Sequence, residues 1–186
     1  MGYYPSLREY VRTLENREQL FRIQREVCRE TELHPLVRWQ FRGLPENERR
    51  AFLFEKVASV TGRKYKMSVL SGACASSRAI YALGMGCREE EIFDRWINAQ
   101  KNPVEPVTVP EGPVQEIDID SGLDDAVDGI PVPLGNPGFD SSLRLTAALW
   151  VTADPETGQR NVGIYSGYIR QGGKISVGLG AGKDSR

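Results

Sequence analysis

Histidine is almost missing from this sequence, because only one of the 186 residues, His34, is a histidine. Zinc hydrolase sites and Ser-His-Asp triads depend on histidine as a metal ligand or as a base. Both classes of site are therefore excluded unless His34 itself supplies that group. His34 stands directly before Pro35 at a predicted helix start, so a structural role is the favoured interpretation of this residue.

Cysteine, excess charge and long apolar runs are also scarce. Cys28, Cys74 and Cys87 are odd in number and widely spaced, which fits neither a disulfide framework nor a metal knuckle. A reducing cytoplasm is the simplest compartment for such a chain. The formal net charge of −1 gives no electrostatic basis for binding nucleic acid or an anionic membrane. No apolar run is long enough to span a bilayer, and residues 1–12 lack the apolar core of a signal peptide.

Residues 1–105 mix helical and strand patterns, and we expect them to form an α/β (α+β) N-terminal domain. Ser6 and Glu9 form a capping-box pattern at the first helix. Further helices are expected over Pro35–Gly43, Ser76–Leu83 and Arg88–Gln100, and strands over Leu20–Ile23, Phe52–Val57 and Lys66–Ser71. In the last helix, Ile92, Phe93, Trp96 and Ile97 are expected on the inner face.

Residues 106–186 have a β character, after a proline-rich linker over Lys101–Gly112. Strands are expected over Val114–Ile119, Ile130–Leu134 (an edge strand), Arg144–Thr152, Asn161–Arg170 and Lys174–Leu179. Tight turns at 154–158 and 171–173 connect the last three strands, a pattern typical of a meander or small barrel. Such a short meander leaves strand edges unpaired, so we expect a longer chain or a partner to complete the sheet.

The run Asn161-Val162-Gly163-Ile164-Tyr165-Ser166 is the first candidate site. Alternation along a strand directs Asn161, Gly163 and Tyr165 to one face and Ile164 and Ser166 to the other. Gly163 inside a strand indicates either close approach by a ligand or a bulge that helps the sheet to curl, and the residues alone leave both interpretations open.

The run from Gly178 to Asp184 is the second candidate site, because its small residues expose main-chain N–H groups beside Lys183. A phosphate group fits this arrangement. The spacing is too short for a P-loop, and no Ser or Thr follows the lysine. A solvent-exposed turn is the alternative, and it is the favoured interpretation if the run is taken alone.

The strand Leu145–Thr152, the turn Asp154–Gly158 and the return strand Asn161–Tyr165 together closely resemble the UbiD family. Ser6–Tyr10, Phe52–Val57 and Ile130–Pro133 resemble earlier parts of the same family. The resemblance implies that the N-terminal domain is followed by an antiparallel split β-barrel of flavin-reductase-like type, which is incomplete in this chain.

The family resemblance also implies a cytoplasmic lyase that decarboxylates, or reversibly carboxylates, aromatic and α,β-unsaturated carboxylic acids. Its cofactor is prenylated FMN, which a partner flavin prenyltransferase supplies. A divalent Mn²⁺ or Mg²⁺ ion and a K⁺ ion hold the flavin phosphate. The carbanion left by loss of CO₂ needs such an electron-sink cofactor, because no side chain stabilises it well. We also expect a homo- or hetero-oligomer with UbiD-like chains, without nucleic acid or a membrane span.

The resemblance implies roles for specific residues. Asn161 matches a metal ligand, and Asp184 falls at a second metal-ligand position where histidine is common in the family. Oxygen ligands of these types suit Mg²⁺ and Mn²⁺. The flavin-binding positions are Thr146, on the partner strand opposite Gly163–Tyr165, together with Asn161, Gly163, Ile164, Tyr165, Ser166 and Lys183.

Two departures from the family pattern limit the activity that the resemblance implies. Ser166 stands where the family usually has an arginine of the catalytic network, and serine has neither its charge nor its planar fork. Arg170 could supply a guanidinium in its place, but it lies more than about 10 Å from Ser166 along the strand. The family's catalytic glutamates lie beyond Arg186, so catalytic residues are not assigned here. Part of an enzyme is the favoured hypothesis, followed by a non-catalytic or degenerate subunit of a larger complex and then a simple FMN-binding reductase.

Overall fold

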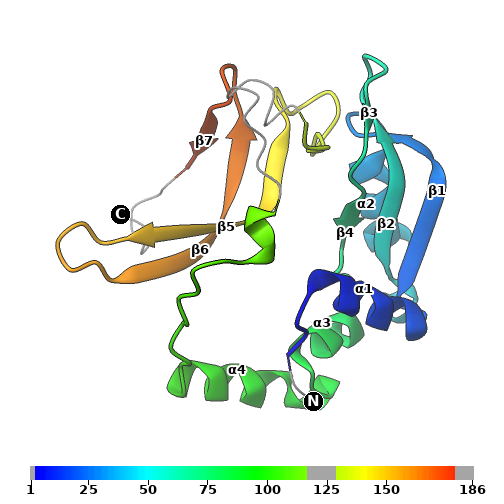
Figure 1. Cartoon of the computed structure of the whole chain (residues 1–186). Coiled ribbons are helices and arrows are strands. Elements are labelled where there is room, and N and C mark those ends of the chain that lie inside the picture. Colours follow the sequence, from blue (N-terminus) through cyan, green and yellow to red (C-terminus); the bar gives the residue numbers. More distant parts are fainter. Residues whose placement is uncertain (1–2, 117–128, 179–186) are drawn as a thin grey trace.

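The computed structural model describes residues 3–116 and 129–178, which form two separate β-sheets joined by a long connection (Figure 1). The first sheet contains β1 (Leu20–Cys28), β2 (Ala51–Ala58), β3 (Lys64–Tyr65) and β4 (Val69–Ser71). Strands β1 and β2 are parallel, and α2 (Leu33–Gly43) lies between them in the sequence. A parallel pair needs a crossover of this kind. Strands β3 and β4 both pair with β2 in antiparallel fashion, so the N-terminal region has the mixed α/β architecture that was predicted.

Strand β2 is the centre of the N-terminal core. Phe54 is fully buried and stacks on Phe52, with 5.7 Å between the ring centroids. Val27 of β1 and Leu33 and Val37 of α2 pack in the same apolar cluster. Burial of these side chains removes apolar surface from water, which is the main favourable contribution to folding.

Helix α1 (Leu7–Asn16) packs in a second apolar cluster of this domain, which includes Tyr10 and Leu14. Its N-cap Ser6 accepts a hydrogen bond from the Glu9 amide, as the capping pattern predicts. Leu14 is fully buried, and the buried Tyr10 hydroxyl donates to the carbonyl oxygen of Ala73 at 2.6 Å. The helix is thereby attached to the loop that precedes α3 (Arg78–Met85).

The predicted helix over Arg88–Gln100 is present but does not bury the face that was expected. A 3₁₀ turn, Glu89–Glu91, leads into α4 (Ile92–Lys101), which contains no buried residue. Phe93 is 72% exposed and Trp96 is 47% exposed, so the prediction of an inner face is wrong for both. The amphipathic pattern of this helix indicates an apolar stripe but does not specify which element covers it.

The second sheet contains β5 (Arg144–Ala153), β6 (Arg160–Ile169) and β7 (Ile175–Val177), in that order and antiparallel. In the β5–β6 turn, Asp154 Oδ1 accepts hydrogen bonds from the Glu156 and Thr157 amides, and Gly158 has a φ of 70°. This turn chemistry explains why the hairpin was predictable. Among the described residues the sheet is open, and the predicted split barrel is not confirmed.

Two predicted strands are not present in the described residues. Pro113–Gln115 form a 3₁₀ turn in place of the start of a strand over Val114–Ile119, and residues 117–119 lie outside the described ranges. Ile130–Leu134 has no strand pairing in the described chain. Its two prolines lack the N–H group that a strand ladder uses, which explains the difference.

The segment 129–143, which we call the connector, attaches the second sheet to the N-terminal domain. The Leu134 amide donates to the carbonyl oxygen of Arg29 at 3.1 Å, and Val132 is only 3% exposed. Arg38 of α2 donates to the Asn136 side chain. The connector therefore contacts α2 and Arg29, the residue that follows β1, and it positions the start of β5.

Candidate functional site

The β5–β6 hairpin carries most of the residues with a predicted role. Its register consists of direct cross-strand pairs, which include Thr152–Asn161, Trp150–Gly163, Leu149–Ile164 and Ala148–Tyr165. The pairing is interrupted once, where Thr146 and Ala147 stand opposite the single residue Ser166. This is the two-against-one arrangement of a β-bulge. Thr146 therefore lies at the Ser166 end of the hairpin and not opposite Gly163–Tyr165.

The predicted flavin-binding residues of β6 share a strand edge and not a single face. Alternation places Asn161, Gly163 and Tyr165 on one face and Ile164 and Ser166 on the other. Strand β7 pairs only with Gly167–Ile169, so no described strand covers residues 161–166 on the side away from β5. A ligand that lies along this edge reaches main-chain groups and side chains from both faces.

The face of β6 that contains Gly163 is partly filled by the chain itself. The Tyr165 ring lies over Gly163, where an added Cβ would be 2.9 Å from the Tyr165 Cζ atom. The indole Nε1 of Trp150 donates to the Tyr165 carbonyl oxygen at 2.9 Å. Glycine at position 163 therefore makes room for the neighbouring tyrosine ring, a structural reason that needs no ligand.

The opposite face of the hairpin is apolar and open. Its four aliphatic side chains are directly paired across the strands and are each 58–69% exposed: Leu149 with Ile164, and Val151 with Val162. We call this surface the aliphatic face. Exposed apolar surface of this kind marks a place where another group packs.

A guanidinium group lies at the Ser166 end of the aliphatic face. Arg144 Nη2 donates to Ser166 Oγ at 2.9 Å, and the Arg144 guanidinium lies over the Tyr168 ring at 5.4 Å. The Arg144 Nε atom is buried without a hydrogen-bond partner. Arg144 is therefore a half-buried cation whose hydrogen-bonding capacity is incompletely used.

Arg170 also lies over the Tyr168 ring, at 5.7 Å, and is held by the sheet. Its Nε donates to Ser176 Oγ of β7 at 3.0 Å. The guanidinium next to Ser166 is thus that of Arg144, a residue that the sequence reasoning missed. Its position follows from the strand register, which pairs Arg144 with Tyr168 and which the sequence pattern did not specify.

His34 lies where α2 meets the connector and the start of β5. Burial lowers the pKa of His34 below its ordinary value of 6.5, and the nearby positive charges of Arg144 and Arg38 lower it further. A hydrogen bond with the Gly135 main chain and the negative charge of Asp140 act in the opposite direction. The imidazole is consequently favoured in its neutral form.

The predicted metal and phosphate contacts are only partly within the described chain. Lys183 and Asp184 lie outside the described residues, whereas Asn161 stands at the start of β6. Within residues 3–116 and 129–178, no group of three or more His, Cys, Asp or Glu side chains is arranged to hold a metal ion. The amide oxygen of Asn161 is a suitable ligand for Mg²⁺ or Mn²⁺, but it needs further oxygen ligands from elsewhere.

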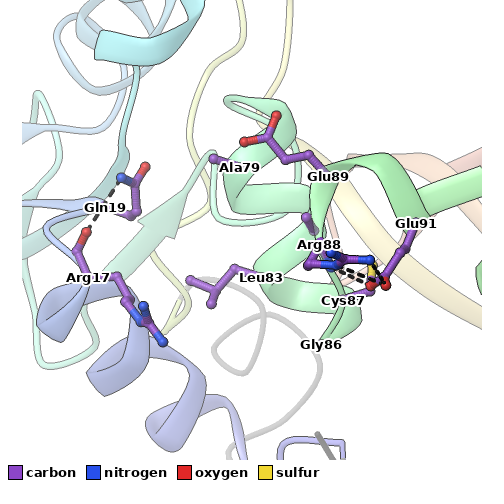
Figure 2. A pocket seen from close by; sticks show the side chains of 10 residues that line it. Arg17, Gln19, Ala79, Leu83, Gly86, Cys87, Arg88, Glu89 and Glu91 are labelled. Atoms are coloured by element: carbon purple, nitrogen blue, oxygen red, sulfur yellow. Dashed lines mark hydrogen bonds and ion pairs between the residues drawn. The ribbon is translucent and has the colours of Figure 1, made fainter.

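A hollow of about 660 Å³ lies away from the hairpin, between the end of α1 and α3 (Figure 2). Arg17 and Gln19 line one side of it, and Leu83 and Cys87 line the other. Arg88 and Glu91 form an ion pair of 2.7 Å at its rim. The hollow contains none of the residues with a predicted role, so its volume alone does not identify it as the reactive site.

No helix in the described part of the chain is long and apolar enough to cross a membrane.

Comparison with known proteins identifies relatives of both parts of the chain. Residues 11–100 match the model of the 3-octaprenyl-4-hydroxybenzoate carboxy-lyase N-terminal domain, which is the UbiD N-terminal domain. A search among curated protein sequences finds no match.

Solved structures of UbiD-class enzymes are similar to almost the whole chain. The chain is similar to HmfF from Pelotomaculum thermopropionicum in complex with FMN, with 29% identity, a TM-score of 0.79 and coverage of 94% of this chain and 37% of that one. An evolved dimeric form of HmfF in complex with prFMN gives 28% identity, a TM-score of 0.81 and coverage of 96% and 39%. Vanillic acid decarboxylase of Sedimentibacter hydroxybenzoicus gives 26% identity, a TM-score of 0.77 and coverage of 95% of this chain and 38% of that one. The chain thus spans less than two fifths of the length of these proteins.

Proposed function

The chain belongs to the UbiD family, and on this premise we propose that it forms part of a prenylated-FMN-dependent lyase. The reaction is the decarboxylation, or the reverse carboxylation, of an aromatic or α,β-unsaturated carboxylic acid. The similarity of almost the entire chain to enzymes in complex with FMN and prFMN is the observation that carries this proposal.

The edge of β6 is the proposed flavin contact. From Asn161 to Ser166 the strand extends about 16 Å, at roughly 3.3 Å per residue, which is comparable with the length of flavin mononucleotide. Asn161 then lies at the phosphate end, and Ile164, Tyr165, Ser166 and the bulge residue Thr146 lie toward the ring end. When bound, prenylated FMN supplies the electron sink for the carbon that loses CO₂.

The cation site is the second element of the proposal. Asn161 offers an amide oxygen, and Asp184 offers a carboxylate to the same Mn²⁺ or Mg²⁺ ion, while Lys183 and a K⁺ ion help to neutralise the phosphate. Oxygen ligands of this type match the preference of these divalent ions. The contribution of this chain is to hold the phosphate end, so that the ring end has a fixed position along β6.

The remaining part of the catalytic apparatus comes from outside these 186 residues in our proposal. Further strands would complete a split barrel from residue 106 onward, beyond a domain of residues 1–105. A longer polypeptide or a UbiD-like partner chain would supply them, in a cytoplasmic oligomer whose cofactor comes from a flavin prenyltransferase. The small size of the sheet supports this view: in the described part of the chain β7 pairs with only Gly167–Ile169 of β6, and a short meander favours further pairing.

A non-catalytic or degenerate subunit of a larger carboxylase or decarboxylase complex is the second candidate function. Ser166 favours it, because a hydroxyl group cannot neutralise a substrate carboxylate as an arginine does. The match of residues 11–100 to the UbiD domain makes a simple FMN reductase the least favoured alternative.

Co-expression with a flavin prenyltransferase tests the proposal. We expect the purified protein to show the absorbance and mass of a modified flavin, together with Mn²⁺ or Mg²⁺. Asn161→Ala should lower the retention of flavin and metal, whereas Asn47→Ala, at an exposed position in a 3₁₀ turn of the N-terminal domain, should not. Unchanged occupancy in Asn161→Ala would remove the metal assignment, and repeated recovery of colourless, metal-free protein would favour the non-catalytic subunit.

A further inference from the structure

Arg144 is a cation without a counter-ion in the described part of the chain. One of its donors reaches Ser166 Oγ, its ring contact is with Tyr168, and its Nε atom has no hydrogen-bond partner. No carboxylate forms an ion pair with it among residues 3–116 and 129–178. Partial burial of a charge is unfavourable unless the charge is paired, so this position favours an incoming anion.

The groups around Arg144 do not neutralise it. Arg38 and Arg144 both lower the pKa of His34 as positive charges, so neither Arg38 nor the neutral imidazole offsets the charge of Arg144. The nearby carboxylate of Asp140 accepts hydrogen bonds from the Asn136 amide at 2.8 Å and from the Asn136 side chain at 3.2 Å. That carboxylate is therefore engaged within the connector and is not paired with Arg144.

The aliphatic face begins next to this cation. Ile164 precedes Ser166 by two residues on the same face of β6, and Leu149 is paired directly with Ile164. Both aliphatic side chains are more than 60% exposed. A molecule with a flat apolar body and one anionic end matches this combination, because its body would cover the aliphatic side chains while its charge meets Arg144.

We propose that Arg144, oriented by Ser166, binds the carboxylate of a flat apolar carboxylic acid whose body lies on the aliphatic face. A guanidinium offers a carboxylate two parallel hydrogen bonds, and Ser166 Oγ fixes the direction of the guanidinium. This assignment rests on the proposed function in one respect, since it takes the acid to be the substrate of that reaction. Phosphate shares the anionic oxygens but has no apolar body to cover Ile164 and Leu149.

Binding of benzoate to the 186-residue chain, without flavin, tests this proposal. We expect NMR shifts of the Ile164, Ser166 and Tyr168 amides on titration with benzoate, and weaker binding of the neutral analogue benzamide. Arg144→Gln should weaken benzoate binding roughly tenfold or more, since it removes a charge-assisted hydrogen bond. Arg144→Lys should retain part of the affinity, and Ser166→Ala should weaken binding several-fold while the fold is kept.

Arg170→Gln is the matched control, because Arg170 contacts the same Tyr168 ring but donates to Ser176 of β7 and not to Ser166. It should leave benzoate affinity unchanged. The proposal is overturned if wild-type protein does not bind benzoate, if Arg144→Gln and Arg144→Lys bind it as tightly as wild type, or if inorganic phosphate binds Arg144 more tightly than benzoate. Failure of the proposed function is a different result, namely absence of flavin from protein that still binds benzoate through Arg144.

Discussion

Lowering the pH from about 7 to about 5 is expected to destabilise the folded chain through His34. In the folded protein, burial and the positive charges of Arg144 and Arg38 lower the pKa of His34 below 6.5, whereas the unfolded chain has the ordinary value. Below about pH 6.5 the unfolded state therefore binds more protons than the folded state. The free energy of unfolding must then fall as the pH falls.

The size of this effect has a clear upper limit. A histidine that stays neutral in the folded state costs at most about 1.4 kcal/mol per pH unit below 6.5, which amounts to about 2 kcal/mol at pH 5. His34 is only partly buried, and solvent screening reduces the expected loss to about 1 kcal/mol. The Glu30 and Glu32 carboxyl groups have a pKa below the ordinary 4.5, so their stabilisation is lost at lower pH than this window.

Urea unfolding at a series of pH values measures this loss directly. Because His34 is the only histidine, His34→Gln removes the titrating group, and its stability should change little between about pH 7 and pH 5. The reasoning is refuted if the wild-type protein is equally stable, or more stable, at the lower pH. It is refuted equally if His34→Gln shows the same slope as the wild type.

Two further predictions concern packing. Phe54→Ala should lower the free energy of unfolding by about 3–5 kcal/mol in urea denaturation, because Phe54 is fully buried. Trp39→Ala, at a 72% exposed position, should change it by about 0.5 kcal/mol or less. Similar losses in both variants would contradict the core assignment. Gly167→Ala should lower the free energy of unfolding by about 1–3 kcal/mol in thermal denaturation, since an added Cβ would lie 2.7 Å from Ile175 Cγ2. Gly43→Ala should be tolerated, because an added Cβ there meets open space. Unchanged stability of Gly167→Ala would show that the sheet repacks freely.

Local patterns predicted much of the fold because their physical causes are local. The Ser6 cap, the β5–β6 hairpin and its Asp154 turn depend on residues that are near each other in the sequence, and all are formed. The resemblance to the UbiD family was likewise recognisable from the hairpin and the N-terminal motifs, and residues 11–100 match the UbiD N-terminal domain.

Patterns were less informative where packing partners decide the outcome. The apolar stripe of α4 was predicted to be buried, yet Phe93 and Trp96 are exposed. The proline-containing segment at 130–134 was predicted as an edge strand, yet it forms no strand and hydrogen-bonds with Arg29, directly after β1, as part of the connector. Neither result follows from periodicity, because periodicity states which side is apolar and not what lies against it.

The sequence by itself determined the order of the main helices and strands, the hairpin and the residues that connect this chain to its family. Only the tertiary structure brought Arg144 next to Ser166, which are 22 residues apart, and placed His34 within electrostatic reach of Arg38 and Arg144. Local turns and caps arise from hydrogen bonds between near neighbours. Contacts across a sheet or between domains depend on strand register and on which surfaces dock, and those are set by the packing of the whole chain.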